Sequence, residues 1–371
     1  MRFVHIADVH LGMSFKTASF GKAFGQKKRE GIKKNLRNVI TYIKDKKIEL
    51  LLIAGDFLEG DYVELTDLYD IKYMFDLIPT VKVVIMAGNH DPLLVRSSPY
   101  TLIEWPPNVT LVKTGYSCYD FEELDTSVIS ISWDSKGPMS LNKEKLNQSI
   151  QLAKHTSKIV MLHGDCYLPN DYFYMETKYL KSLNVDYIAL GHIHKHDIME
   201  NHIVYPGSLE PLDFSENYPH GYINGELNDH KLNIEFIPSM INPMDVVDVD
   251  ISTCQSYLEM VDVVKETLES HEGINDQSMV RVLLNGEKSP YIGEISKDFI
   301  QELKDMNQNR ISYIEVKDKT VLGYDIEVLY EEHKDDLIGY FIRSIKEEGM
   351  DDEVNQKALN KGIAMLLEAM G

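Results

Sequence analysis

The chain has 371 residues, 43% of them hydrophobic, and a formal net charge of −21, so it is long enough for two or three domains with sizeable cores. It contains no apolar run of about 18 residues that could form a transmembrane helix. Its three scattered cysteines suit a reducing compartment and do not have the spacing of a zinc site. The chain starts with a strand pattern where a signal peptide would have an apolar segment and a cleavage site, so we expect a cytoplasmic protein.

Apolar runs of strand length alternate with helical segments in the first half of the chain. Runs typical of strands buried on both faces lie at 2–7, 49–54 and 81–87, with helices predicted between them at 27–47 and 64–77. Further strands are predicted at 109–112, 128–132, 159–162 and 187–190, and further helices at 141–155 and 176–183. This order predicts a layered α/β domain with its site at the carboxyl ends of the strands.

The pattern changes near residue 240. Residues 203–238 are rich in strand and turn signals and close the first domain, predicted at 1–240. A small α+β domain is predicted at 241–328. Two helices with apolar faces are expected in the remainder, 329–371.

Potential metal ligands follow the first two strands. Asp8 and His10 are two residues apart and would point the same way if the strand geometry continued. Asp56 follows the second strand through Gly55, and its carboxylate could bridge two cations. Taken alone, each of these motifs is as typical of an ordinary turn.

Three later motifs add imidazole and amide groups. In Gly88-Asn89-His90-Asp91 (88–91), Asn89 offers a neutral oxygen ligand, and His90 could donate a proton to the substrate while Asp91 holds its ring. His163 follows the strand at 159–162, and His192 and His194 follow the strand at 187–190. Two adjacent divalent metals are a common device for cleaving phosphate esters, and these motifs supply the ligands for such a site.

In this order the motifs resemble those of the calcineurin-like metallophosphoesterase superfamily. The resemblance implies a four-layer αββα sandwich, with His90 as a catalytic histidine that binds no metal. It divides the ligands between two metals: Asp8, His10, Asp56 and His194 for one, and Asp56, Asn89, His163 and His192 for the other. It also implies two Mn²⁺ ions, and the mixed ligands leave Fe²⁺, Mg²⁺ and Zn²⁺ as alternatives.

Two segments narrow the resemblance to the SbcD-type DNA repair exonucleases. They are HIADVHLG at 5–12 and YPGSLEPLDFSE at 205–216, and the layout with a capping domain and C-terminal helices is also similar. This branch implies a 3′→5′ exonuclease and structure-dependent endonuclease that acts on duplex ends and hairpins in double-strand-break repair. It also implies a homodimer and an SbcC-like coiled-coil ATPase that docks on the C-terminal helices. The alternative is that the apolar faces of both helices pack within this chain.

The chain departs from some nucleases of this branch at one position. They carry a histidine, linked to exonuclease activity, three residues after the bridging aspartate, and here that position is Glu59. The departure leaves the balance between exonuclease and endonuclease action open.

A basic stretch close to the first motif could contact the phosphate backbone of DNA. Between residues 14 and 37 it has a net charge of +7, which leaves −28 for the rest of the chain. The residues predicted to contact DNA are Lys16, Lys22, Lys27, Lys28, Arg29, Lys33 and Lys34. The alternative is a solvated helix face.

Two other functions compete with the nuclease. A phosphodiesterase of the same superfamily acting on small nucleotides would need no partner and no basic stretch. A DNA-end tethering scaffold would tolerate the loss of ligands, yet every expected ligand is present.

Overall fold

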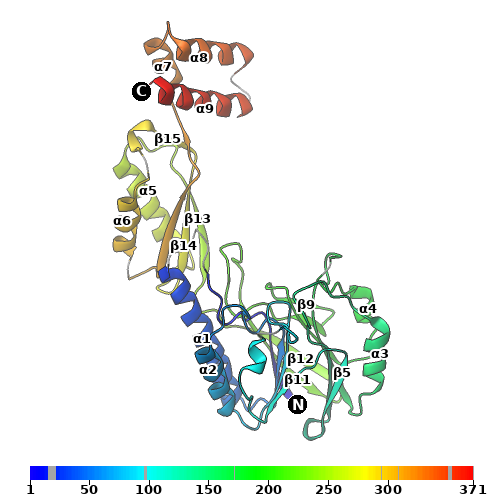
Figure 1. Ribbon diagram of the computed structural model, residues 1–371. Helices are drawn as coiled ribbons and strands as arrows, with labels where there is room; N and C mark the ends of the chain where they lie inside the picture. Colours follow the sequence, from blue (N-terminus) through cyan, green and yellow to red (C-terminus); the bar gives the residue numbers. More distant parts are fainter. Residues whose placement is uncertain are drawn as a thin grey trace. The chain divides into compact units, whose positions relative to one another are not determined.

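The computed structural model divides the chain into two units, Met1–Pro243 and Met244–Gly371 (Figure 1). The residues that it describes are 1–15, 22–95, 98–170, 172–293, 295–307, 309–349 and 353–370.

Two six-stranded sheets form the centre of the first unit. The first has the order β12 (Lys231–Pro238), β11 (Gly221–Asn228), β1 (Arg2–Ile6), β2 (Leu50–Ala54), β3 (Lys82–Met86) and β4 (Val109–Leu111). The second has the order β5 (Ser117–Phe121), β6 (Thr126–Ser130), β7 (Ser157–His163), β8 (Tyr187–Gly191), β10 (Ile203–Tyr205) and β9 (Asp197–Met199). The strands β1 to β4 are parallel, and so are β6, β7, β8 and β10.

The main core lies between the two sheets. It joins Phe3 and Leu52 of the first sheet to Val128 and Ile159 of the second, and all four are fully buried. Helices α1 (Lys22–Asp45) and α2 (Leu65–Asp76) lie on the side of the first sheet, and α3 (Lys143–Gln151) and α4 (Thr177–Lys181) cover the second (Figure 1). The four layers confirm the predicted αββα sandwich.

The helix α1 follows from its spacing of apolar residues. Ile32, Leu36, Val39 and Ile43 recur at intervals of three and four and are buried. The helix begins five residues before the predicted start, at Lys22. The edge strand β5 was not predicted, because its residues are mostly half-exposed and have no continuous apolar run.

The second unit contains a small parallel sheet. Its strands are β13 (Met244–Asp250), β14 (Met279–Asn285) and β16 (Tyr313–Asp318), connected by α5 (Tyr257–Ser270) and α6 (Lys297–Asn307). Two short strands, β15 (Glu287–Lys288) and β17 (Val321–Leu322), pair with each other, and α7 (Ile326–Glu332) follows β17 in the sequence.

The last two helices, α8 (Leu337–Glu348) and α9 (Glu353–Met370), pack on each other through Ile338, Ile342, Leu359 and Ile363. These four residues are buried within the chain. Their burial agrees with the alternative to partner docking, in which the apolar faces of the two helices pack within this chain. Among the described residues, no helix has both the length and the apolar character needed to span a membrane.

Candidate metal centre

The potential ligands converge where parallel strands of both sheets end. Asp8 and Asp56 follow β1 and β2, and Asn89 follows β3. From the second sheet, His163 is the last residue of β7, and His192 follows β8 directly. The structure therefore brings all seven predicted metal ligands, which include His10 and His194, to one edge of the sandwich.

The backbone at four of these seven ligands is left-handed. The φ angles are +52° at Asp8, +48° at His10, +47° at Asp56 and +97° at His192. The strand geometry does not continue past Ile6, so Asp8 and His10 reach the same site through sharp turns and not from one side of a strand. Left-handed residues other than glycine are uncommon and cluster at functional sites.

Two glycines allow the ligand loops to approach one another. A Cβ atom at Gly191 would lie 1.9 Å from the carbonyl oxygen of Ala54, and one at Gly88 would lie 2.3 Å from Oδ1 of Asp56. Both distances are well below van der Waals contact, so side chains here would separate the loops.

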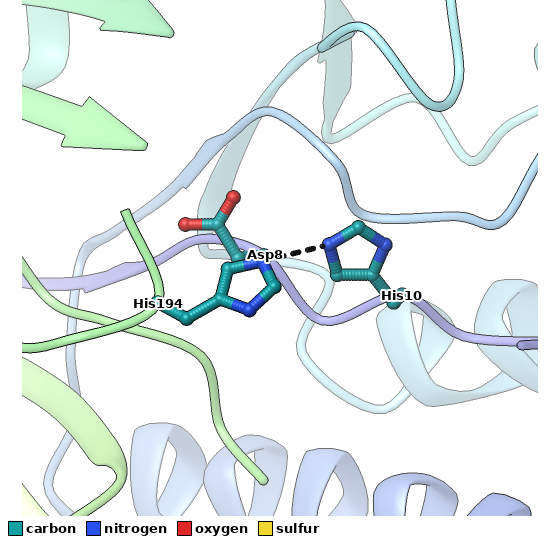
Figure 2. A group of neighbouring side chains, drawn as sticks. All are labelled: Asp8, His10 and His194. Atoms are coloured by element: carbon teal, nitrogen blue, oxygen red, sulfur yellow. Dashed lines mark hydrogen bonds between the residues drawn. The ribbon is translucent and has the colours of Figure 1, made fainter. Parts of the chain in front are cut away.

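The first group of ligands is Asp8, His10 and His194 (Figure 2). The Nε2 atoms of His10 and His194 lie 3.3 Å apart. Oδ2 of Asp56 lies 3.8 Å from Nε2 of His10, so the same carboxylate borders this group.

The second group contains Asp56, His163 and His192. Nε2 of His163 lies 3.2 Å from Oδ2 of Asp56 and 3.0 Å from Oδ1 of Asn89. The same Asn89 oxygen lies 3.2 Å from Nδ1 of His192. Asp56 thus lies between the two groups, as a bridging ligand would.

Outer acceptors fix the orientation of three imidazoles. Nδ1 of His10 lies 3.1 Å from Oε2 of Glu59, and Nδ1 of His194 lies 2.7 Å from Oε1 of Glu216. Nδ1 of His163 lies 2.9 Å from the carbonyl oxygen of Ala54. With Nδ1 donating to these acceptors, each Nε2 faces the site and can present its lone pair to a cation.

The catalytic candidate His90 is held by Glu59, whereas Asp91 was expected to hold it. Nδ1 of His90 lies 3.1 Å from Oε1 of Glu59. The carboxylate of Asp91 instead accepts hydrogen bonds from the backbone N–H groups of Leu58 and Gly88 and from the Tyr100 hydroxyl. The role assigned to Asp91 from the sequence was therefore wrong: it ties the loops after β2 and β3 together.

The charges of the site are strongly coupled. Burial opposes the charge of Asp56, but His163, His10 and His90 outweigh it and lower the pKa of its carboxyl. Burial also disfavours the protonated ring of His163, yet Asp56 and other neighbours raise its pKa to about 9. This environment favours positive charge among the ligand atoms.

The pKa values around His90 follow from its partner. The hydrogen bond from His90 to Glu59 is the main reason why the pKa of His90 rises to about 9. Burial opposes the charge of Glu59, but His10 and His90 lower its pKa to about 2. Burial and the charge of Asp56 raise the pKa of Asp91 to about 6.

The donor set fits divalent cations. The facing Nε2 lone pairs of His10 and His194, with the carboxylates of Asp8 and Asp56 beside them, need positive charge between them. Imidazole, carboxylate and amide donors suit Mn²⁺ or Fe²⁺ and do not exclude Zn²⁺.

The basic stretch is only partly available to a ligand. Lys28 is fully buried and lies 3.5 Å from Glu210, and Lys33 is paired with Asp67 and Asp70, so the prediction that Lys28 contacts DNA was wrong. Lys34 is exposed, and Lys27 and Arg29 are half-buried. Lys16 and the side chain of Lys22 lie outside the described residues.

The sequence reasoning missed Glu216 as a part of the site. It lies in the segment 205–216 that carries the narrower resemblance, and that segment was the available signal. Glu59 was noticed only as a departure, although it lies just three residues after the bridging carboxylate of Asp56.

The sequence of the chain is similar to those of known proteins. Residues 1–196 match the family model described as "Calcineurin-like phosphoesterase". The chain is 23% identical over 328 residues to "Uncharacterized metallophosphoesterase YhaO" of Bacillus subtilis, which covers 84% of this chain and 78% of that protein. It is 25% identical over 317 residues to "DNA double-strand break repair protein Mre11" of Methanocaldococcus jannaschii, which covers 81% of this chain and 78% of that protein. The crystal structure of TT1561 of Thermus thermophilus is similar with a TM-score of 0.39 and 12% identity, over 63% of this chain and 98% of that chain.

Proposed function

The chain belongs to the calcineurin-like phosphoesterases, and from this premise we propose that it hydrolyses the phosphodiester bonds of DNA. The proposed activity is that of a metal-dependent 3′→5′ exonuclease and structure-dependent endonuclease at DNA ends in double-strand-break repair. The observation that carries the chemistry is the position of Asp56 between two groups of ligands, with His90 beside them. The choice of DNA is supported by the similarity, over 81% of the chain, to a protein named for double-strand break repair.

The ligands fall into two sets, one for each of two cation positions. Asp8, His10, Asp56 and His194 would hold one cation, and Asp56, Asn89, His163 and His192 would hold the other. When bound, two divalent cations supply a water of lowered pKa as the nucleophile and offset the negative charge on the phosphoryl oxygens. Mn²⁺ is the proposed metal.

His90 would protonate the oxygen that leaves. Its side chain is 45% exposed, so it can meet a substrate, and Glu59 occupies its Nδ1. The proton available for transfer is therefore on Nε2. Since Glu59 also holds His10, one carboxylate orients both a metal ligand and the proton donor.

The exposed part of α1 would contact the DNA backbone. Lys34 and Arg37 are exposed on this helix and can approach phosphates. Arg29 lines a cavity of about 350 Å³ together with Gly12 and Tyr62. Gly12 lies two residues after the ligand His10 in the sequence. A strand that leaves the metal centre could enter it.

A second copy of the chain would dock on α2. Leu65, Tyr69 and Tyr73 are four residues apart and are 50%, 55% and 65% exposed, which gives the helix an apolar stripe. In size-exclusion chromatography with light scattering, we expect the wild type to be a dimer and a Tyr69→Glu variant to be a monomer. A wild type that is monomeric at all concentrations would contradict this proposal.

An SbcC-like ATPase is the proposed partner of the C-terminal helices. The apolar residues Leu337, Tyr340 and Met365 are each 62% exposed on α8 and α9, whereas Ile338 and Ile342 are buried. The exposed residues could meet a partner without unfolding the helix pair.

The decisive experiment is incubation of the full chain with Mn²⁺ and an end-labelled duplex or hairpin DNA. A His90→Ala variant is the control, and bis-p-nitrophenyl phosphate is a reference substrate that needs little help with its leaving group. We expect DNA cleavage that is lost in the variant. If the chain cleaved bis-p-nitrophenyl phosphate but not DNA, both without and with the ATPase, the result would favour a phosphodiesterase for small nucleotides and contradict the nuclease. DNA binding without any hydrolysis would favour a tethering scaffold.

A further inference from the structure

The two groups of ligands differ in what lies behind their imidazoles. In the group of Asp8, His10 and His194, both histidines have a carboxylate at Nδ1, from Glu59 and Glu216. In the other group, His163 has a neutral carbonyl oxygen at Nδ1. His192 faces the site with Nδ1, and its ring stacks on Tyr172 at a centroid distance of 6.2 Å.

This difference matters because an outer carboxylate makes an imidazole a stronger electron donor and holds its tautomer and orientation. A carbonyl oxygen fixes the tautomer but carries no formal charge. The position bordered by His10 and His194 therefore presents two imidazoles whose Nδ1 atoms are hydrogen-bonded to carboxylates. At the other position the nearest carboxylate to Nδ1 of His163 is that of Asp8, at 4.0 Å, which is beyond hydrogen-bond distance.

Glu216 is itself anchored in the orientation that it needs. Its Oε2 accepts a hydrogen bond of 2.8 Å from the backbone N–H of Leu212, which leaves Oε1 for His194 at 2.7 Å. Its carbonyl oxygen lies 3.1 Å from Nε2 of His220, which is buried and also bonded to Ser208.

The loop that carries Glu216 is fastened to the rest of the unit at two further points. The backbone N–H of Ser208 donates to the carbonyl oxygen of His194 over 3.0 Å. The carboxylate of Glu210 accepts hydrogen bonds from Asn35 of α1 and from the backbone of Ile241, at 2.8 and 2.6 Å. The carboxylate of Glu216 is thus positioned by the fold and not by a flexible surface loop.

We propose that Glu216 is a positioning residue that, through His194, makes the Asp8–His10–His194 position the tighter of the two metal positions and the first to fill. The position of His163 and His192 then fills second and exchanges more readily. This inference rests on the proposed two-metal site and adds an order of binding and the residue that sets it.

The test is a titration of the metal-free full chain with Mn²⁺, followed by calorimetry and by the electron paramagnetic resonance signal of bound Mn²⁺. We expect two binding steps in the wild type, with a signal of isolated Mn²⁺ after the first. In Glu216→Gln the first step should weaken by roughly 10- to 100-fold, the effect typical of losing an outer carboxylate. Glu216→Asp should recover part of the affinity, because it keeps the charge.

Two controls separate positioning from a general loss of charge or structure. Glu226→Gln removes an exposed acid of β11 and should bind Mn²⁺ as the wild type does. Asn89→Ala removes a ligand of the second position only, so the first step and its sensitivity to Glu216→Gln should persist.

Three outcomes would overturn the inference. A first step in Glu216→Gln within about threefold of the wild type would show that Glu216 does not set the affinity. An equal loss in Glu226→Gln would reduce the effect to net charge. A wild type that binds no Mn²⁺ would reject the proposed function as well. Two binding steps with the same affinities in the wild type and in Glu216→Gln would reject only the role of Glu216.

Discussion

Replacing Glu59 with glutamine tests the link between His90 and the leaving group. The carboxylate of Glu59 lies 3.1 Å from Nδ1 of His90 and 3.1 Å from Nδ1 of His10. Glutamine has almost the same shape but offers one acceptor oxygen and no charge, so it cannot replace the carboxylate at the Nδ1 atoms of both rings. We expect the pKa of His90 to fall towards its ordinary value.

The size of the effect follows from the pKa of His90, which is about 9 in the presence of Glu59 against an ordinary 6.5. At pH 8 roughly 90% of His90 is protonated with the first value and about 3% with the second. Because Asp56 and Asp91 also raise the pKa of His90 and remain in the variant, loss of DNA cleavage should reach at most about 30-fold at pH 8 and stay below about twofold at pH 6. Cations bound nearby would lower the pKa of His90 in both proteins and move this window to lower pH, so the complete pH profiles of the two proteins are compared.

The assay is the rate of DNA hydrolysis between pH 6 and pH 9 at saturating Mn²⁺, beside bis-p-nitrophenyl phosphate. The alkoxide that leaves from DNA is a strong base and needs a proton, whereas p-nitrophenolate leaves without one. The defect should thus appear with DNA, grow with pH, and be small with the aryl ester.

Equal losses on both substrates at every pH would refute this reasoning. Glu59 would then act only through His10 and the loading of metal. A rate unchanged on DNA at pH 8 would show that the proton on His90 does not depend on this carboxylate.

Three further predictions concern the framework of the site. Glu210→Ala leaves the fully buried Lys28 without its carboxylate and should lower the free energy of unfolding by about 3–5 kcal/mol, measured by urea denaturation. If Glu210→Ala and Lys28→Met lowered the free energy of unfolding equally within error, this prediction would be contradicted. Gly88→Ala would place a Cβ atom 2.3 Å from Oδ1 of Asp56 and should weaken Mn²⁺ binding by at least about tenfold in a metal titration, whereas unchanged binding would show that the loop can yield. Burial lowers the pKa of His5 to about 3, so the unfolded chain takes up the extra proton below pH 6.5. The stability that a neutral His5 gives is complete above pH 6.5 and is lost as the pH falls towards 3, and His5→Asn should flatten this decline in urea midpoints.

The layered fold could be predicted because its strands are buried on both faces. Residues Leu50–Ala54 are all fully buried, and such strands appear in the sequence as continuous apolar runs. The edge strand β5 has one face against solvent and could not be recognised in this way. The positions of the ligands after strand ends followed from the rule that parallel sheets place their sites there.

The partners of the site residues could not be predicted, since they depend on contacts between loops. Glu59 and Asp91 are both acids that follow strand ends near the site, and only the left-handed turn of the chain after β2 brings Glu59 to the ring of His90. The burial of Lys28 was predictable in principle. Lys28 lies four residues before Ile32 and eight before Leu36, so it shares the apolar face of α1. This four-residue spacing was overlooked because Lys28 lies among other charged residues.

The left-handed backbone at Asp8, His10, Asp56 and His192 has a consequence for how this site can change in evolution. Aspartate, asparagine and histidine are the side chains that tolerate this conformation best after glycine, so the turns and the ligands select the same residue types. A descendant that abandoned the chemistry could not drift to valine or isoleucine at these positions without straining the turns. Its lost ligands should be replaced by glycine or asparagine, and such replacements in a related sequence would mark an inactive protein that keeps this fold.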